Sequence, residues 1–246
     1  MTRLACSAGL LALAGCAGPP PAPSFDWTEL GAGLRIDPGR RVVEFDGTVA
    51  TDVHDPITPT VWLELFVTGP DTREHESLVV TRVPPSLIHA ALLAVGAEPG
   101  SPGRVRMEDD GGVTRRPATG DPVRVEFVLA HGTTVGGVHD PASWVVHETT
   151  GEPLADSEPW GDGGFVFAGS RVVVRGGQTG GGGGREVYDA DMTGVVVPLT
   201  TFGSGVIAPR LTLSHASDLD EPVWVARRER VPAFGVPVTV RVTLLD

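Results

Sequence analysis

The sequence contains no lysine, and its 246 residues include only two cysteines, Cys6 and Cys16. Both cysteines lie near the N-terminus, so a domain that begins after Cys16 has no thiol for a disulfide, an iron–sulfur cluster or a cysteine-based zinc site. Such a domain also has no cysteine nucleophile. Several classes of enzyme and metalloprotein are therefore excluded for the folded part of the chain.

Positive charge is also scarce. Arginine supplies all 19 basic residues, against 31 aspartates and glutamates, and the formal net charge at pH 7 is −12. An acidic surface argues against nucleic acid as a partner and against electrostatic adhesion to anionic lipid. Attachment of this protein to a membrane would therefore need a lipid anchor.

The N-terminus predicts such an anchor. The apolar run of residues 4–14 follows Arg3 and is too short to span a bilayer as a helix, which indicates a signal peptide. The stretch LAGC that ends at Cys16 matches the bacterial lipobox, in which small residues precede a diacylated cysteine. We expect residues 1–15 to be removed and Cys16 to carry fatty acyl chains such as palmitate. An ordinary secretory signal that contains a cysteine by chance is the alternative.

A tether and one domain are predicted to follow. The proline-rich stretch AGPPPAPS after Cys16 is typical of an extended spacer, and we assign residues 16–33 to the lipidated cysteine and this tether. Residues 34–246 then form the folded domain, and a chain with 41% hydrophobic residues can bury a substantial core.

The pattern along the domain is mainly that of β-strands. The 33 glycines and 22 prolines disfavour long helices and predict many turns. Alternation with a period of two residues predicts seven strands, and in the last of them four apolar side chains share one face. We predict an α+β fold that is mainly β, with antiparallel or mixed, sandwich-like sheets. The predicted strands begin at Val42, Val61, Val123, Phe165, Gly194, Pro222 and Val236.

One short helix interrupts this pattern. Pro85 suits the first turn of a helix, and Gly96 suits a left-handed end. Between them, apolar residues at spacings of three and four predict an amphipathic helix that packs on the sheet. These residues are Leu87, Ile88, Ala91, Leu92 and Val95.

We also expect a strand that carries His75, followed by a proline turn into this helix. Short motifs from residue 75 onward follow a characteristic order. They are His75-Glu76-Ser77, Pro85, Ile88 to Leu93 with His89, Gly96, Pro99-Gly100, Pro102, Pro117 to Val123, Trp144, Phe167 to Ser170, Tyr188, Asp191 and Gly194. This order resembles the YdjY domain family of bacterial proteins over about residues 37–205. The resemblance implies an exported or envelope-attached protein and assigns no activity. The chain departs from the pattern in a glycine-rich loop at residues 176–184, and Arg73 stands where a lysine is expected.

His75, Glu76, Ser77 and His89 are the candidate functional cluster. The two histidines and the glutamate offer nitrogen and oxygen ligands, and His147 or Asp191 could complete a metal site from distant strands. The spacing is not that of a helical zinc motif, however, and the alternative is that these residues fix the turn between strand and helix.

Serine catalysis is the alternative chemistry for this cluster. Ser77 lies two residues after His75, so the two would share a face if both were in a strand. No nucleophile elbow surrounds Ser77. We therefore assign no catalytic residue, no metal and no cofactor.

The sequence as a whole predicts a lipoprotein of the bacterial cell envelope, held in the membrane through Cys16 and facing the periplasm or the cell exterior. Its expected role is non-catalytic binding, scaffolding or assembly, because the sequence offers no convincing catalytic constellation. An envelope enzyme, metal-dependent or hydrolytic, that uses His75, Glu76 and His89 is the first alternative. An accessory subunit with an envelope protein partner is the second.

Overall fold

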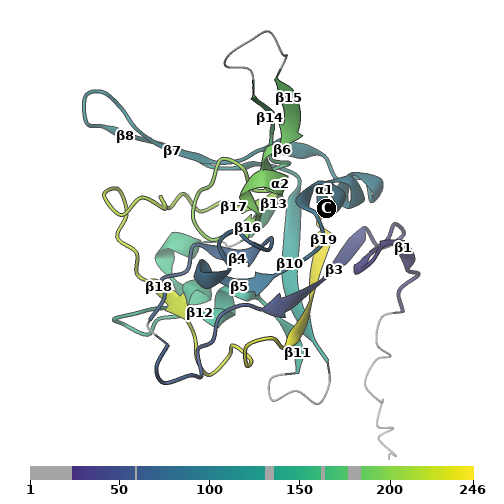
Figure 1. Ribbon diagram of the computed structural model, residues 1–246, viewed down its shortest axis with the longest axis horizontal. Coiled ribbons are helices and arrows are strands. Elements are labelled where there is room, and N and C mark those ends of the chain that lie inside the picture. The colour runs from purple at the N-terminus through teal and green to yellow at the C-terminus, as the bar shows by residue number, and fades with distance from the viewer. Residues whose placement is uncertain (1–23, 59, 131–135, 162–163, 177–183) are drawn as a thin grey trace, which may run out of the picture.

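A computed structural model of the protein describes residues 24–58, 60–130, 136–161, 164–176 and 184–246 (Figure 1). The predicted signal peptide, Cys16 and much of the tether lie outside the described residues, as do residues 177–183 of the glycine-rich loop. Within the described part of the chain, every helix is too short or too polar to cross a bilayer.

One large curled sheet forms the centre of the molecule. The strands at the two ends of this sheet, β16 and β17, also contact each other, so the sheet is a near-barrel. The pairings are antiparallel except that of β4 with β5, which is parallel. The prediction of a mainly β fold with mixed pairing is confirmed, whereas the sandwich-like arrangement is not. The order is β16 (Val195–Pro198), β4 (Leu65–Thr68), β5 (Ser77–Val80), β3 (Val42–Val49), β19 (Pro237–Leu244), β10 (Pro122–Leu129), β13 (Phe165–Phe167) and β17 (Ile207–Pro209).

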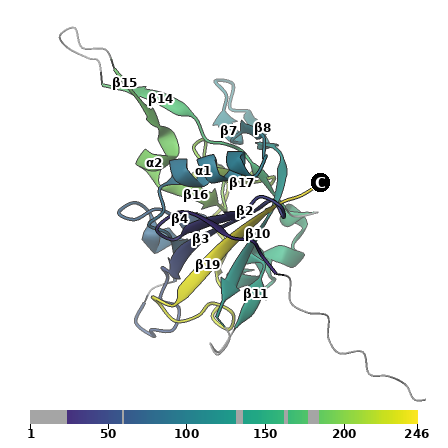
Figure 2. The same ribbon diagram turned by 90° about the vertical axis from the view of Figure 1, so that its right-hand side faces the viewer.

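Smaller elements surround this sheet. Three strands extend it: β1 (Thr28–Gly31) pairs with β2 (Leu34–Asp37), β2 with β3, and β11 (Gly137–His139) with β10. Four separate pairs are β6 (Pro99–Ser101) with β9 (Thr119–Gly120), β7 (Arg104–Met107) with β8 (Val113–Arg116), β12 (Val145–His147) with β18 (Trp224–Ala226), and β14 (Val172–Arg175) with β15 (Arg185–Tyr188). The short 3₁₀ helices are η1 (Glu74–Glu76), η2 (Pro141–Trp144), η3 (Leu154–Asp156) and η4 (Glu158–Trp160). The β7–β8 and β14–β15 hairpins project from the body of the molecule (Figures 1 and 2).

The last strand of the chain lies in the middle of the main sheet. β19 is paired along its length with β3 on one side and with β10 on the other. Its alternate residues Val238, Val240, Val242 and Leu244 are buried, as the period of two predicts. The core therefore depends on a strand formed by the C-terminal end of the sequence.

The strand predicted from Phe165 is divided into two. Gly169 has a φ of +82° and Ser170 has a φ of +53°, a left-handed conformation that cannot continue a strand. β13 therefore ends before these residues, and β14 begins after them in a separate hairpin. Alternation of residue type could not reveal this break, because the apolar pattern resumes after it.

The helix α1 (Pro85–Ala94) forms as predicted, with Pro85 in its first turn. It packs on β2 and β3 (Figure 2). Ile88, Ala91, Leu92 and Val95 are buried. Leu87 is an exception, because it is 47% exposed. Each residue advances a helix by about 100°, so the residue before Ile88 points well away from the buried stripe.

A second helix was not predicted. α2 (Asp189–Thr193) has only five residues, too few to show a periodic apolar stripe. It ends at Gly194, whose φ is +71°. The Asp189 carboxylate in its first turn is buried and bonds Arg171 Nε at 2.7 Å. α2 contacts α1, so the two helices lie together beside the sheet.

Candidate functional site

The segment that carries His75 is a 3₁₀ turn, not the strand that we predicted. η1 contains His75, and β5 begins only at Ser77. The turn is fixed because the Glu74 carboxylate accepts hydrogen bonds from the backbone N–H groups of Asp71 and Thr72. Bonds of this kind leave no periodic signal in the sequence.

His75 and Ser77 consequently do not share a face. The His75 side chain is 73% exposed, whereas Ser77 is fully buried. The Ser77 hydroxyl donates to the Arg73 carbonyl oxygen at 2.7 Å. A hydroxyl that donates its proton to the backbone is not aligned with a histidine base, so the expected common face of these two residues is wrong.

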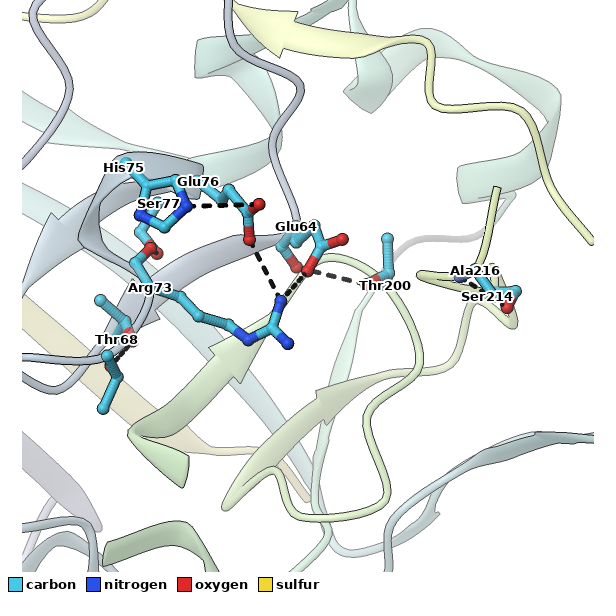
Figure 3. A network of polar contacts seen from close by, with 10 residues as sticks. Glu64, Thr68, Arg73, His75, Glu76, Ser77, Thr200, Ser214 and Ala216 are labelled. Carbon is cyan, nitrogen blue, oxygen red and sulfur yellow. Dashed lines mark hydrogen bonds and ion pairs between the residues drawn. The ribbon is translucent and has the colours of Figure 1, made fainter. Parts of the chain in front are cut away.

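Arg73 joins two glutamates next to this turn, as Figure 3 shows. Its Nη1 atom lies 2.5 Å from Glu64 Oε2 and 3.1 Å from Glu76 Oε2. His75 Nε2 lies 3.4 Å from the other oxygen of Glu76. The guanidinium carbon of Arg73 is 5.1 Å from the centre of the Phe202 ring, a cation–π contact. One guanidinium group therefore holds two carboxylates close together.

Glu64 titrates near neutral pH. Burial raises the pKa of its carboxyl group from 4.5 to about 7, the charge of Glu76 adds to this effect, and Arg73 opposes it. The backbone of Glu64 is held by hydrogen bonds to Glu76, at 2.9 Å, and from Leu199 and Thr200, at 2.8 and 3.1 Å. A carboxyl group with a shifted pKa in a fixed position is typical of functional sites.

The Glu64 carboxyl group faces a cleft of about 400 Å³. We call it the Glu64 cleft. Its described lining contains four carboxylate residues and two histidines but no arginine, and two tryptophans form part of its wall. Arg73 and Arg115 neutralise part of the negative charge from outside the lining. These lining residues are Glu64, Glu76, Asp220, Glu221, His75, His215, Trp62 and Trp224.

The two tryptophans are positioned by polar contacts and ring contacts. Trp62 is 45% exposed, and its Nε1–H donates to Glu148 Oε2 at 3.0 Å. Trp224 is largely buried and packs edge-to-face on His147, with the ring centres 5.6 Å apart. His147 thus supports the wall of the Glu64 cleft and does not line it. An exposed indole beside carboxylates offers both an apolar face and hydrogen-bond acceptors to a ligand.

His89 lies in different surroundings. Its ring packs edge-to-face on Phe167 and Tyr188, and its Nδ1 is 2.8 Å from the Tyr188 hydroxyl. That hydroxyl donates to the Gly169 carbonyl oxygen at 3.0 Å, so Nδ1 of His89 must carry a proton and donate to the tyrosine. Burial lowers the pKa of His89, which favours the neutral ring. His89 therefore acts as a packed hydrogen-bond donor between α1 and β15.

Asp191, Gly169 and Gly194, which also belong to the family motifs, lie around the helices α1 and α2. Asp191 Oδ1 accepts from the Ser86 N–H at 2.8 Å and so caps the start of α1 from α2. A Cβ atom on Gly169 would lie 2.6 Å from Pro99 Cβ, so only glycine fits there. On Gly194 a Cβ atom would lie 2.3 Å from Thr72 Oγ1. The motif glycines, His89 and Asp191 thus fix how the helices join the sheet.

A protein-family model for the YdjY domain matches residues 34–243. The chain belongs to the YdjY domain family. The match extends beyond the range of about residues 37–205 that the motifs suggested, and it includes the last strands of the sheet. No curated protein and no solved structure matches the chain.

The YdjY domain thus separates the four candidate residues. His75 and Glu76 line the Glu64 cleft, Ser77 is buried beneath η1, and His89 lies at the junction of α1, β13 and β15. Across the residues that the structure describes, no three histidine, cysteine, aspartate or glutamate side chains are grouped to hold a metal ion.

Glu64 and His215 were not predicted from the sequence. Glu64 is a single acidic residue between Leu63 and Leu65 in an apolar run, and this exception to the pattern was the available signal. No signal pointed to His215, which reaches the Glu64 cleft from an irregular segment that no strand pattern covers.

Proposed function

We propose that this YdjY-domain protein is an envelope lipoprotein, anchored through Cys16, with a non-catalytic binding role, and that the Glu64 cleft holds its ligand. The observation that carries the binding role is the combination in one cleft of an exposed Trp62 face with four carboxylates. The Leu13 to Cys16 motif and the proline-rich spacer support the anchor. An envelope protein partner is a further part of the proposal.

The chemistry of the Glu64 cleft favours a ligand with an amine or guanidinium group attached to an apolar body. Carboxylates accept hydrogen bonds from such cations, and an indole ring attracts them through its π face. Negative charge and an aromatic wall together disfavour an anionic ligand at this site.

Binding is favoured because polar groups at and near the carboxylates are already held in place by hydrogen bonds within the protein. The Ser77 hydroxyl donates to the Arg73 carbonyl oxygen, and Ser214 Oγ accepts from the Ala216 N–H at 3.0 Å. Arg73 holds the two glutamates and balances part of their charge. The cleft therefore offers fixed acceptors and an aromatic face, which is the composition of a recognition site.

Calorimetric titration with cadaverine and agmatine tests this proposal. We expect saturable binding that falls at least about tenfold in Trp62→Ala, because both cation–π contact and apolar area are lost. Trp27→Ala is the matched control, since Trp27 stacks on Phe25 with ring centres 4.7 Å apart and does not line the cleft. Equal loss in both variants, or no binding of either amine to the wild type, would disprove the assignment of the ligand class.

A hydrolytic enzyme is the second candidate, and the pKa of Glu64 is the observation that favours it. A carboxyl group with a pKa of about 7 next to a second carboxylate can act as a general acid at neutral pH. His89 has no part in this version, because it does not line the cleft. Assays with chromogenic glycosides and esters would support the enzyme if turnover were lost in Glu64→Gln and kept in His89→Gln.

A further inference from the structure

The β7–β8 hairpin projects from the body of the molecule (Figure 1). Three of its arginines lie on one face. Arg104 and Arg106 are two residues apart in β7 and so point to the same side. Arg116 of β8 is paired directly with Arg104, which places its side chain on that side too. Like charges directly opposite each other in a sheet are destabilising unless a counterion lies between them.

These three arginines have no carboxylate partner within the described part of the chain. Arg115, on the opposite face of the same hairpin, does have a carboxylate partner. Its two terminal nitrogens bond the Asp220 carboxylate at 2.6 and 2.8 Å. In a chain with 31 acidic residues, one face of the hairpin is thus neutralised and the other is left cationic.

The cationic face lines a cavity of about 440 Å³ at the base of the hairpin. We call it the arginine pocket. Arg171 and His215 add to its lining, and Glu108 is its only carboxylate among the described residues. The Nε–H group of Arg171 donates a hydrogen bond to Asp189 Oδ2 at 2.7 Å. Its terminal nitrogens make no hydrogen bond to another described residue, and Gly203 leaves space beside Nη1, because a Cβ atom there would lie 3.7 Å away.

His215 has a fixed position in the arginine pocket. Its ring stacks on Phe202 with the ring centres 4.7 Å apart and an angle of 14° between the planes. The base of β7 is held close by Gly103, where a Cβ atom would lie 3.0 Å from the Arg116 carbonyl oxygen and 3.1 Å from Thr201 Cγ2. The pocket therefore has a packed base and four guanidinium groups around it.

We propose that the arginine pocket binds a ligand that carries phosphate groups. Guanidinium groups offer planar pairs of N–H donors that match phosphate oxygens. The positive charge of several guanidinium groups around one pocket is larger than a single carboxylate such as Glu108 can neutralise. The volume exceeds that of one phosphate ion, so the pocket has room for a second phosphate or a larger body attached to the first. The arginine pocket shares His215 with the Glu64 cleft, but its arginines do not line that cleft, and the phosphate proposal does not depend on the amine proposal.

Calorimetry with inorganic pyrophosphate tests the proposal on the mature protein. The triple variant Arg104→Gln, Arg106→Gln, Arg116→Gln should bind at least about tenfold more weakly than the wild type, and the wild-type affinity should fall as salt is added. The matched control removes the same charge at three exposed arginines outside the pocket that also lack ion pairs with described residues. These are Arg82, Arg124 and Arg210.

Two further measurements separate the outcomes. Glu108→Gln removes the one carboxylate that described residues contribute to the pocket and should strengthen pyrophosphate binding. Glycerophosphoglycerol, the headgroup of an anionic phospholipid, distinguishes the source of the phosphate: tighter binding than pyrophosphate indicates a lipid, and weaker binding indicates a soluble phosphate compound. The proposal is overturned if neither compound binds saturably or if the control triple variant loses as much affinity as the pocket variant.

Discussion

Glu64 makes the stability of the protein depend on pH. Its pKa is about 7 in the folded protein, against 4.5 for an ordinary glutamate, so between these values the folded state holds a proton that the unfolded state has lost. The contribution of this group to stability is therefore complete below pH 4.5 and decreases as the pH rises towards 7. The free energy of unfolding falls in this range because Glu64 must ionise in a partly buried position beside Glu76.

Glu64→Gln should remove this dependence, because the amide resembles the protonated acid at every pH. Relative to the wild type, the variant should gain about 1 kcal/mol in free energy of unfolding between pH 5 and pH 8, a value reduced for solvent screening in the open cleft. Urea midpoints across that range would measure it. Glu29→Gln, at an exposed position in β1, is the control. A constant difference between Glu64→Gln and wild type at all pH values would contradict the shifted pKa.

The helix α1 offers a matched pair of leucines that tests its buried stripe. Leu92 is fully buried, whereas the adjacent Leu93 is 47% exposed. Leu92→Ala should lower the free energy of unfolding by about 2–5 kcal/mol, and Leu93→Ala should lower it by less than about 1 kcal/mol. Denaturant unfolding of the two variants measures both changes in the free energy of unfolding. Similar losses would mean that the buried face of α1 is assigned wrongly.

Elements with a long periodic signal were predictable from the sequence. The strands at Val42, Val123 and Val236 and the helix at Pro85 formed close to where their patterns placed them, because burial of one face determines both the pattern and the structure. The η1 turn and α2 were not predictable, because side-chain hydrogen bonds and a left-handed glycine determine them.

The candidate site was predictable only in part. His75 and Glu76 attracted notice as a local cluster, and both line the Glu64 cleft. Glu64, His215 and Trp224 reach the same cleft from distant positions in the chain. Since their meeting depends on how the sheet curls, no local pattern contains it.

At the scale of the whole molecule, the proposed anchor is separable from the fold. Cys16→Ser should abolish lipid attachment and leave the protein uncleaved or released from the membrane, because the acylated sulfur is what signal peptidase recognises. Intact mass spectrometry of membrane and soluble fractions would show this. A mature protein that starts at any residue other than an acylated Cys16 would refute the anchor.

The central position of β19 predicts that the domain cannot lose its C-terminal end. Removal of residues 236–246 should abolish cooperative unfolding, because β3 and β10 would then have no strand between them. Removal of the residues up to Gly31 should leave a cooperative transition, since β1 pairs only with β2 at the margin of the sheet. Thermal melts followed by circular dichroism compare the two truncations, and a cooperative melt of the first would contradict the prediction.

The same arrangement governs when folding is completed during synthesis. Glu44 in β3 and Arg241 in β19 are hydrogen-bonded partners 197 positions apart, so the whole segment between them must leave the ribosome before these strands can pair. Closing so long a loop makes folding slow and keeps the unfinished chain open. The placement of β19 thus delays completion of the central sheet until residues 237–244 have been synthesised.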